Sequence, residues 1–142
     1  MTSQPSKTET IIFGSLLVTL LWLPMPLASN RDWSAMLLCA IVAALSIAWL
    51  ISYMFGKAKL SYCFKKSKYI LLLLSFSQAY IAYQYIYSIT IEPESTFKEL
   101  LLGVSFYLIF CLCLLLINSP KRIKTCLYTI VLSGVFQAVY GS

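Results

Sequence analysis

Five long apolar stretches, separated by short polar loops, constrain this chain more than any other feature. They cover approximately residues 8–28, 33–55, 69–91, 100–117 and 126–140. A helix needs about 20 apolar residues to cross a hydrocarbon core about 30 Å thick. The pattern therefore predicts an all-α fold. We expect a polytopic transmembrane bundle with four complete spans and a fifth, terminal span.

Positive charge alternates between the loops and predicts how the chain is oriented. Five lysines lie between residues 56 and 68, and three more basic residues lie between residues 118 and 125. The other two loops hold Arg31 and Lys98, each beside an acidic residue. Cytoplasmic loops retain Lys and Arg. We therefore expect the lysine-rich loops and the N-terminus on the cytoplasmic side.

Composition excludes several classes of protein. A chain that is 60% hydrophobic, with a mean hydropathy of +0.82, lies outside the range of soluble globular domains. The net charge of +6 borders the apolar stretches, which favours anionic lipid headgroups over nucleic acid as partners. There is no histidine, and Cys111 and Cys113 point to nearly opposite sides of a helix. We predict no metal, no cofactor and no disulfide framework.

No pattern typical of an active site occurs. The chain lacks a G-x-S-x-G motif and a phosphate-binding loop. No ionisable residue lies deep in an apolar stretch, which argues against a small transporter with a proton relay. We predict no catalytic residue.

The third stretch differs from the others because polar side chains recur on one face. Tyr80 and Gln84 are four residues apart and lie deep in the stretch, where an amide or phenol needs a polar partner. They are candidate substrate-binding residues. The alternative is an interfacial aromatic belt, which the sequence favours for Tyr83, Tyr85 and Tyr87.

Local signals predict helix ends and packing faces. Thr96 and Glu99 have capping-box spacing ahead of the fourth stretch, and Pro120 is expected to end that helix. The fourth stretch is almost wholly apolar, which suggests that it faces lipid. Small residues at a spacing of four in the second stretch predict a face that packs closely on another helix; they are Ala40, Ala44, Ala48 and Ser52.

A compact polar cluster follows Pro24 and Pro26, and its central residue is Arg31. A guanidinium in that place can pair with a diphosphate or a carboxylate. The alternative is that Arg31 and Asp32 only satisfy the start of a helix that Asn30 caps. Local evidence favours the second interpretation.

The string Leu-Pro-Met-Pro-Leu-Ala-Ser-Asn-Arg-Asp-Trp, residues 23–33, resembles the first outer loop of the O-antigen ligase and polymerase superfamily. Residues 133–141, Ser-Gly-Val-Phe-Gln-Ala-Val-Tyr-Gly, are similar to the fifth span of that family. The resemblance implies a multi-pass protein of the bacterial inner membrane. Its relatives transfer or polymerise glycans carried on undecaprenyl diphosphate at the periplasmic face. It also implies a weak contact of Arg31 with the donor diphosphate.

The leading hypothesis is that residues 1–142 are one transmembrane region, the N-terminal part of a longer ligase-like or polymerase-like protein. The last stretch reaches Gly141 and Ser142 without a charged or aromatic anchor, which favours this view. The family's catalytic positions would lie in later loops, so this part alone is expected to be inactive. Its other partners would be further helices of the longer chain or a partner subunit. The alternative is a small multi-span accessory or assembly protein without catalysis.

Overall fold

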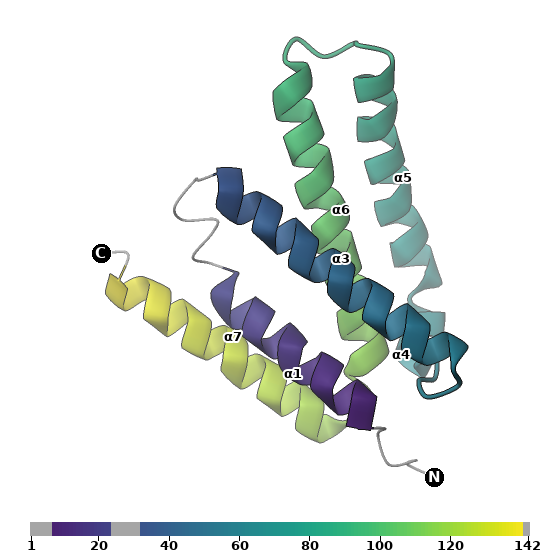
Figure 1. Cartoon of the computed structure of the whole chain (residues 1–142), viewed down its shortest axis with the longest axis vertical. Coiled ribbons are helices and arrows are strands. Elements are labelled where there is room, and N and C mark those ends of the chain that lie inside the picture. The colour runs from purple at the N-terminus through teal and green to yellow at the C-terminus, as the bar shows by residue number, and fades with distance from the viewer. Residues whose placement is uncertain (1–6, 24–31, 141–142) are drawn as a thin grey trace.

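A computed structural model describes residues 7–23 and 32–140, and every regular element in these ranges is a helix (Figure 1). The predicted all-α class is confirmed. The elements are α1 (Lys7–Trp22), α3 (Asp32–Met54), α4 (Tyr62–Lys66), α5 (Lys68–Ile86), α6 (Pro93–Leu116) and α7 (Pro120–Tyr140).

Two of these helices, α3 and α6, are long and apolar enough to cross a membrane. Their best windows both have a mean hydropathy of 2.4. Only 22% of the window in α3 and 28% of that in α6 is buried inside the molecule, so most of their apolar surface faces outward. The arrangement of four complete spans and a fifth remains a prediction.

Helix α6 lies at the centre of the packing. It contacts α5, α3, α4 and α1, whereas α7 packs on α1 and α5 packs on α6 and α4. The core forms where α1, α3 and α6 meet, around the fully enclosed side chains of Leu16, Leu38, Val42 and Leu116. One side of α6 is therefore protein core, so the fourth apolar stretch cannot face lipid all round, although most of its surface faces outward.

The packing side of α3 also differs from the prediction. Ala40 and Ala44 are exposed, so the first half of the small-residue stripe does not pack against another helix. In the second half, Ala48 packs against the core and Ser52 is buried. The buried side of α3 instead carries Leu38, Val42 and Trp49. Large side chains that fill space between helices decide this contact.

Helix α5 ends five residues before the predicted boundary at residue 91. Ser88 has a φ of 51°, the left-handed conformation that terminates many helices. Its N–H donates to the Tyr85 carbonyl, and the N–H of Ile89 donates to the Gln84 carbonyl at 3.1 Å. The chain therefore reverses before the apolar run is finished.

Helix α6 begins at Pro93, seven residues before the predicted apolar stretch. The expected capping box does not form. The Thr96 hydroxyl donates to the Glu92 carbonyl at 3.0 Å, and the Ser95 hydroxyl donates to the Glu92 carboxylate at 3.0 Å. Proline fits the first turn because its missing N–H would lack a partner there. Glu92 is thus the N-cap residue.

Pro120 begins α7 and does not end α6, which already stops at Leu116. Ser119 accepts a hydrogen bond from the Arg122 N–H through its hydroxyl at 3.4 Å, and its carbonyl accepts the N–H of Ile123 at 3.1 Å. Serine followed by proline is a helix-start signal. The last helix therefore starts six residues before the predicted span.

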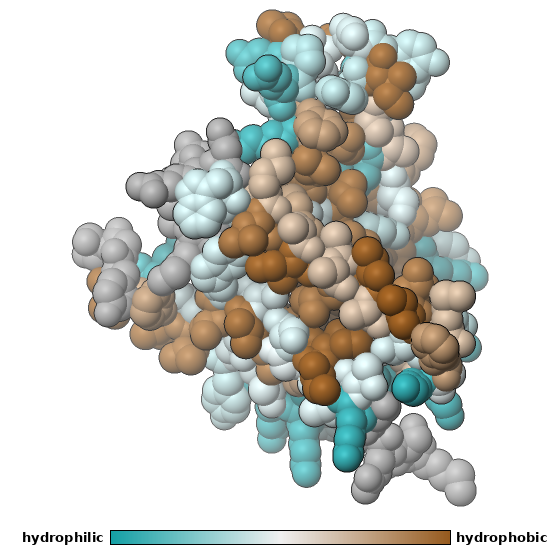
Figure 2. All heavy atoms as spheres, in the orientation of Figure 1, coloured by the Kyte–Doolittle hydropathy of each residue, from teal (hydrophilic) through white to brown (hydrophobic). Residues whose placement is uncertain are grey.

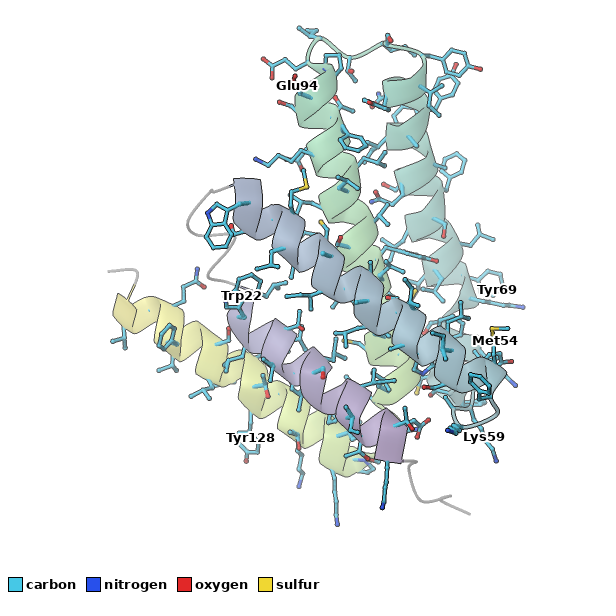
Figure 3. All side chains as sticks on the ribbon, viewed as in Figure 1. Trp22, Met54, Lys59, Tyr69, Glu94 and Tyr128 are labelled. Carbon is cyan, nitrogen blue, oxygen red and sulfur yellow. The ribbon has the colours of Figure 1, made fainter. Side chains whose placement is uncertain are left out.

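Polar and apolar surface are segregated along the molecule. Figure 2 shows hydrophobic side chains over the middle of the visible face, with hydrophilic ones gathered at the lower end and at the tip of the α5–α6 hairpin. Lys59 lies at the lower end and Glu94 at the hairpin tip (Figure 3). An apolar waist between two polar ends is what a helical bundle presents to a bilayer.

Candidate lipid-facing groove

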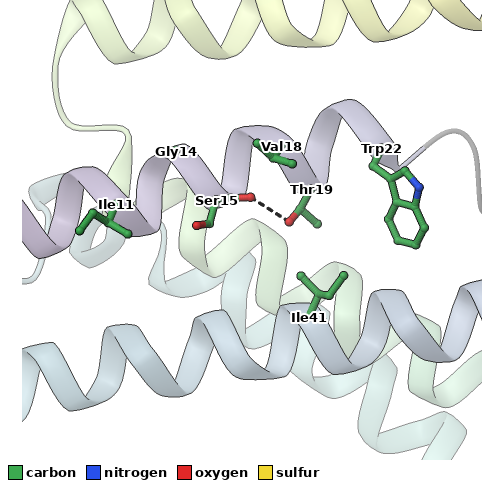
Figure 4. A pocket seen from close by; sticks show the side chains of 7 residues that line it. All are labelled: Ile11, Gly14, Ser15, Val18, Thr19, Trp22 and Ile41. Atoms are coloured by element: carbon green, nitrogen blue, oxygen red, sulfur yellow. Dashed lines mark hydrogen bonds between the residues drawn. The ribbon is translucent and has the colours of Figure 1, made fainter.

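An apolar groove of about 520 Å³ runs along α1 and is closed on one side by α3 (Figure 4). Most of its lining comes from one face of α1, with a single contribution from α3. Its lining residues are Ile11, Gly14, Ser15, Val18, Thr19, Trp22 and Ile41. Figure 4 shows Trp22 at one end and Ile11 at the other, so the groove follows most of the length of α1.

Gly14 gives the groove its depth near the middle of α1. A Cβ built at this glycine meets no atom within 4 Å. The neighbouring Val18 and Ile11 are each 68% exposed. The groove is thus open to the surroundings along this face, and its walls are mainly apolar.

The polar atoms in the lining are largely satisfied inside α1. The Thr19 hydroxyl donates to the Ser15 carbonyl at 2.9 Å, drawn as the dashed line in Figure 4. Such a bond to the preceding turn is the usual solution for threonine in an apolar helix. None of the seven lining residues is an acid or a base, and their exposed surface is mainly apolar.

The residues predicted from sequence to bind substrate do not line this groove. Tyr80 and Gln84 lie one turn apart on α5; Tyr80 is 58% exposed and Gln84 is half-buried. Helix α5 contacts neither α1 nor α3. Asn30 and Arg31 lie outside the described residues.

The groove itself was not predicted from the sequence. The available signal was Gly14 followed by Ser15 in an otherwise bulky apolar helix, which marks a place where a neighbour can approach closely. That signal does not reveal which helix lies opposite. The partner, Ile41 on α3, is known only from the fold.

A buried arginine closes the lysine-rich end of the bundle. Arg122 in the first turn of α7 is 9% exposed, and its Nη1 donates to the Leu116 carbonyl at 2.7 Å. Its guanidinium carbon lies 5.0 Å from the centre of the Phe13 ring. A cation at the last carbonyls of a helix is favourable. Arg122 therefore joins α7, α6 and α1 and is a structural residue.

A second polar contact joins α7 to α1 farther from the lysine-rich end. The Ser133 hydroxyl on α7 donates to the Leu21 carbonyl on α1 at 3.2 Å. Within residues 7–23 and 32–140, no group of three or more His, Cys, Asp or Glu residues could hold a metal ion.

Comparison with known proteins identifies no relative: no family model, no curated protein and no solved structure matches the chain.

Proposed function

We propose that this chain is a multi-pass protein of the bacterial inner membrane that holds the hydrocarbon tail of a lipid-linked glycan. The donor would be an undecaprenyl-diphosphate glycan, and the chain would form part of an O-antigen ligase-like or polymerase-like glycosyltransferase. The observation that carries this proposal is the open, mainly apolar groove along α1. A groove with these walls suits an isoprenoid or acyl chain.

The place of the groove in the chain supports the proposal. Trp22 lines one end of the groove, and residue 23 begins the string that resembles the outer loop of that superfamily. That string leads directly to α3, which supplies the opposite wall. A tail in the groove would therefore place its headgroup at the Trp22 end, which is followed in sequence by the string that contains Arg31.

The role proposed for this part of the protein is binding without chemistry. The groove lining holds no acid, base or metal-ligating cluster, and a transferase needs groups that act on the leaving diphosphate or the acceptor hydroxyl. Those groups would come from other parts of a longer chain or from a partner.

Replacing Gly14 by leucine tests the groove directly. A Cβ added there meets no atom within 4 Å, and leucine favours the helix over glycine by roughly 1 kcal/mol. We expect a folded protein whose affinity for undecaprenyl diphosphate falls about tenfold, because the new side chain fills the groove. The measurement is binding of the labelled lipid to protein in nanodiscs.

Gly134→Leu is the matched control. Gly134 lies on α7, away from the groove, and its added Cβ also meets nothing within 4 Å. Unchanged binding in Gly134→Leu with weaker binding in Gly14→Leu is the expected pair of results. Equal affinities in wild type and Gly14→Leu would remove the groove from the proposal.

Cys63 allows the proposed membrane orientation to be measured by labelling, without introducing another cysteine. It is exposed, whereas Cys39, Cys111, Cys113 and Cys126 are half-buried or buried. We expect a membrane-impermeant maleimide to modify Cys63 only after the inner membrane is permeabilised, because the lysine-rich end should be cytoplasmic. Labelling of Cys63 in spheroplasts with an intact inner membrane would place that end outside.

A further inference from the structure

The lysine-rich end carries positive charge with no exposed counter-charge among the described residues. Its one described acid is Glu9 in the first turn of α1, which is only 8% exposed. The described acids beyond α3 all lie at the opposite end, around the start of α6. The exposed cations at this end are Lys7, Lys57, Lys59, Lys65, Lys66, Lys68, Lys121 and Lys124.

The segment that joins α3 to α5 holds four of these lysines on a fixed backbone, and Lys68 begins α5. Gly56 has a φ of +69°, and the N–H groups of Lys57 and Ala58 both donate to the Ser52 carbonyl, at 2.9 and 3.2 Å. This arrangement folds the chain back at the end of α3. Ala58 is then buried in the core, with 4% exposure.

Helix α4 continues this fixed arrangement. The Ser61 hydroxyl accepts the Cys63 N–H at 3.3 Å and caps the helix. Phe64 packs against the core cluster. Ala58 and Phe64 thus anchor this segment to the core. The neighbouring lysines therefore project from a folded surface: Lys57 and Lys59 flank Ala58, and Lys65 and Lys66 follow Phe64.

Large aromatic side chains are exposed within this run of lysines and on both sides of it. Phe55 is 75% exposed, Tyr62 is 77% exposed and Tyr69 is 74% exposed. The Lys68 ammonium lies 4.9 Å above the centre of the Tyr69 ring. Aromatic side chains mixed with lysines are typical of the boundary between lipid tails and headgroups.

We propose that residues 54–69 form a binding surface for the headgroups of anionic phospholipids in the membrane that holds the protein. The fixed lysines would contact the phosphates, while the exposed aromatic and aliphatic side chains would enter the tail boundary. A duplex polyanion, whose bases are already stacked on one another, would use the lysines and leave those aromatic side chains in water, so the lipid is the better match. This inference rests on the membrane location proposed above and is independent of glycan transfer.

The test compares which lipids stay bound to the purified protein. Protein is extracted from vesicles containing equal amounts of phosphatidylglycerol and phosphatidylcholine, and retained lipids are counted by native mass spectrometry. We expect wild type to retain phosphatidylglycerol preferentially. The quadruple variant Lys57→Gln, Lys59→Gln, Lys65→Gln, Lys66→Gln should lower that preference about tenfold.

Four further measurements separate this surface from general charge effects. The same four positions changed to arginine should keep the preference. So should Lys121→Gln with Lys124→Gln, which removes charge from the start of α7. The double variant Lys65→Gln, Lys66→Gln should show a partial loss, which keeps the test valid if the quadruple variant does not fold. Addition of inorganic phosphate should not displace the lipid.

The proposal would be overturned if wild type, the quadruple glutamine variant and the Lys65→Gln, Lys66→Gln variant all showed the same lipid preference. Displacement of phosphatidylglycerol by RNA at equal phosphate concentration would also overturn it. Loss of undecaprenyl-diphosphate binding in Gly14→Leu, with phosphatidylglycerol preference intact, separates the two sites. Each proposal can therefore fail without the other.

Discussion

Replacing Arg122 by alanine should lower the free energy of unfolding by about 3 kcal/mol. The change removes the hydrogen bond from the guanidinium to the Leu116 carbonyl and the contact with the Phe13 ring. A hydrogen bond to a charged group contributes about 1.5–3 kcal/mol, and a largely desolvated cation–π contact can add about 1–2 kcal/mol. The measurement is thermal or denaturant unfolding in detergent, followed by far-ultraviolet circular dichroism.

Lys121→Ala provides the matched control for this experiment. Lys121 is the preceding residue in the same helical turn, carries the same charge and is exposed. Its removal should change stability by less than about 0.5 kcal/mol. Arg122→Lys should recover only part of the loss, because an ammonium lacks the planar group that lies over Phe13. If Arg122→Ala and Lys121→Ala are equally stable, Arg122 does not join the three helices.

A large side chain at position 103 should separate α5 from α6. A Cβ built on Gly103 would lie 2.5 Å from Oε1 and 2.8 Å from Nε2 of Gln78. Gly103→Ala can be accommodated if the flexible Gln78 amide moves, so we expect a loss below about 1 kcal/mol. Gly103→Leu forces the helices apart and should cost about 2–3 kcal/mol.

The second-site change Gln78→Ala tests whether this clash is the cause. The Gln78 Oε1 is buried without a hydrogen-bond partner, so shortening that side chain should itself cost little. Combined with Gly103→Leu, it should restore at least half of the lost stability in a double-mutant cycle. Additive effects of the two changes would show that the destabilisation arises elsewhere. Gly14→Leu, which meets open space, is the control for introducing leucine.

Helix content and the breaks between helices could be predicted from the sequence, because apolar length and proline position are local properties. The two longest apolar helices, α3 and α6, coincide with predicted stretches. Helix ends could be predicted less well. Ser88 adopts a left-handed conformation that the sequence favours no more than neighbouring residues, and Pro120 is compatible both with ending one helix and with starting the next.

The packing faces could not be predicted because hydropathy does not separate side chains that touch lipid from those that touch protein. Leu112, in the core, and Val104, 39% exposed, belong to the same apolar run of α6. Short α4 was also missed, because five residues carry no periodic signal of their own. Its position depends on Phe64 reaching the core.

For the candidate site, the sequence could predict only the class of ligand. A lipid-like ligand follows from an apolar chain with few ionisable groups, but the groove depends on the angle between α1 and α3. Tyr80 and Gln84 were correctly placed on one face of one helix, yet that helix does not contact α1 or α3. Helical spacing reveals which residues of one helix lie together and gives no information about neighbouring helices.

Among the described residues, the backbone of α7 lies close to α1 alone, and α7 reaches α6 through the Arg122 side chain. Its side-chain ties to other helices include Arg122 in the first turn and Ser133 in the second half of the helix. Tension applied at the last described residue of α7 would therefore peel this helix away turn by turn while α3, α5 and α6 stay folded. In a single-molecule pulling trace, α7 should detach first, at low force. Rupture of the Arg122 contacts with Leu116 and Phe13 should mark the step after which α7 no longer covers α1.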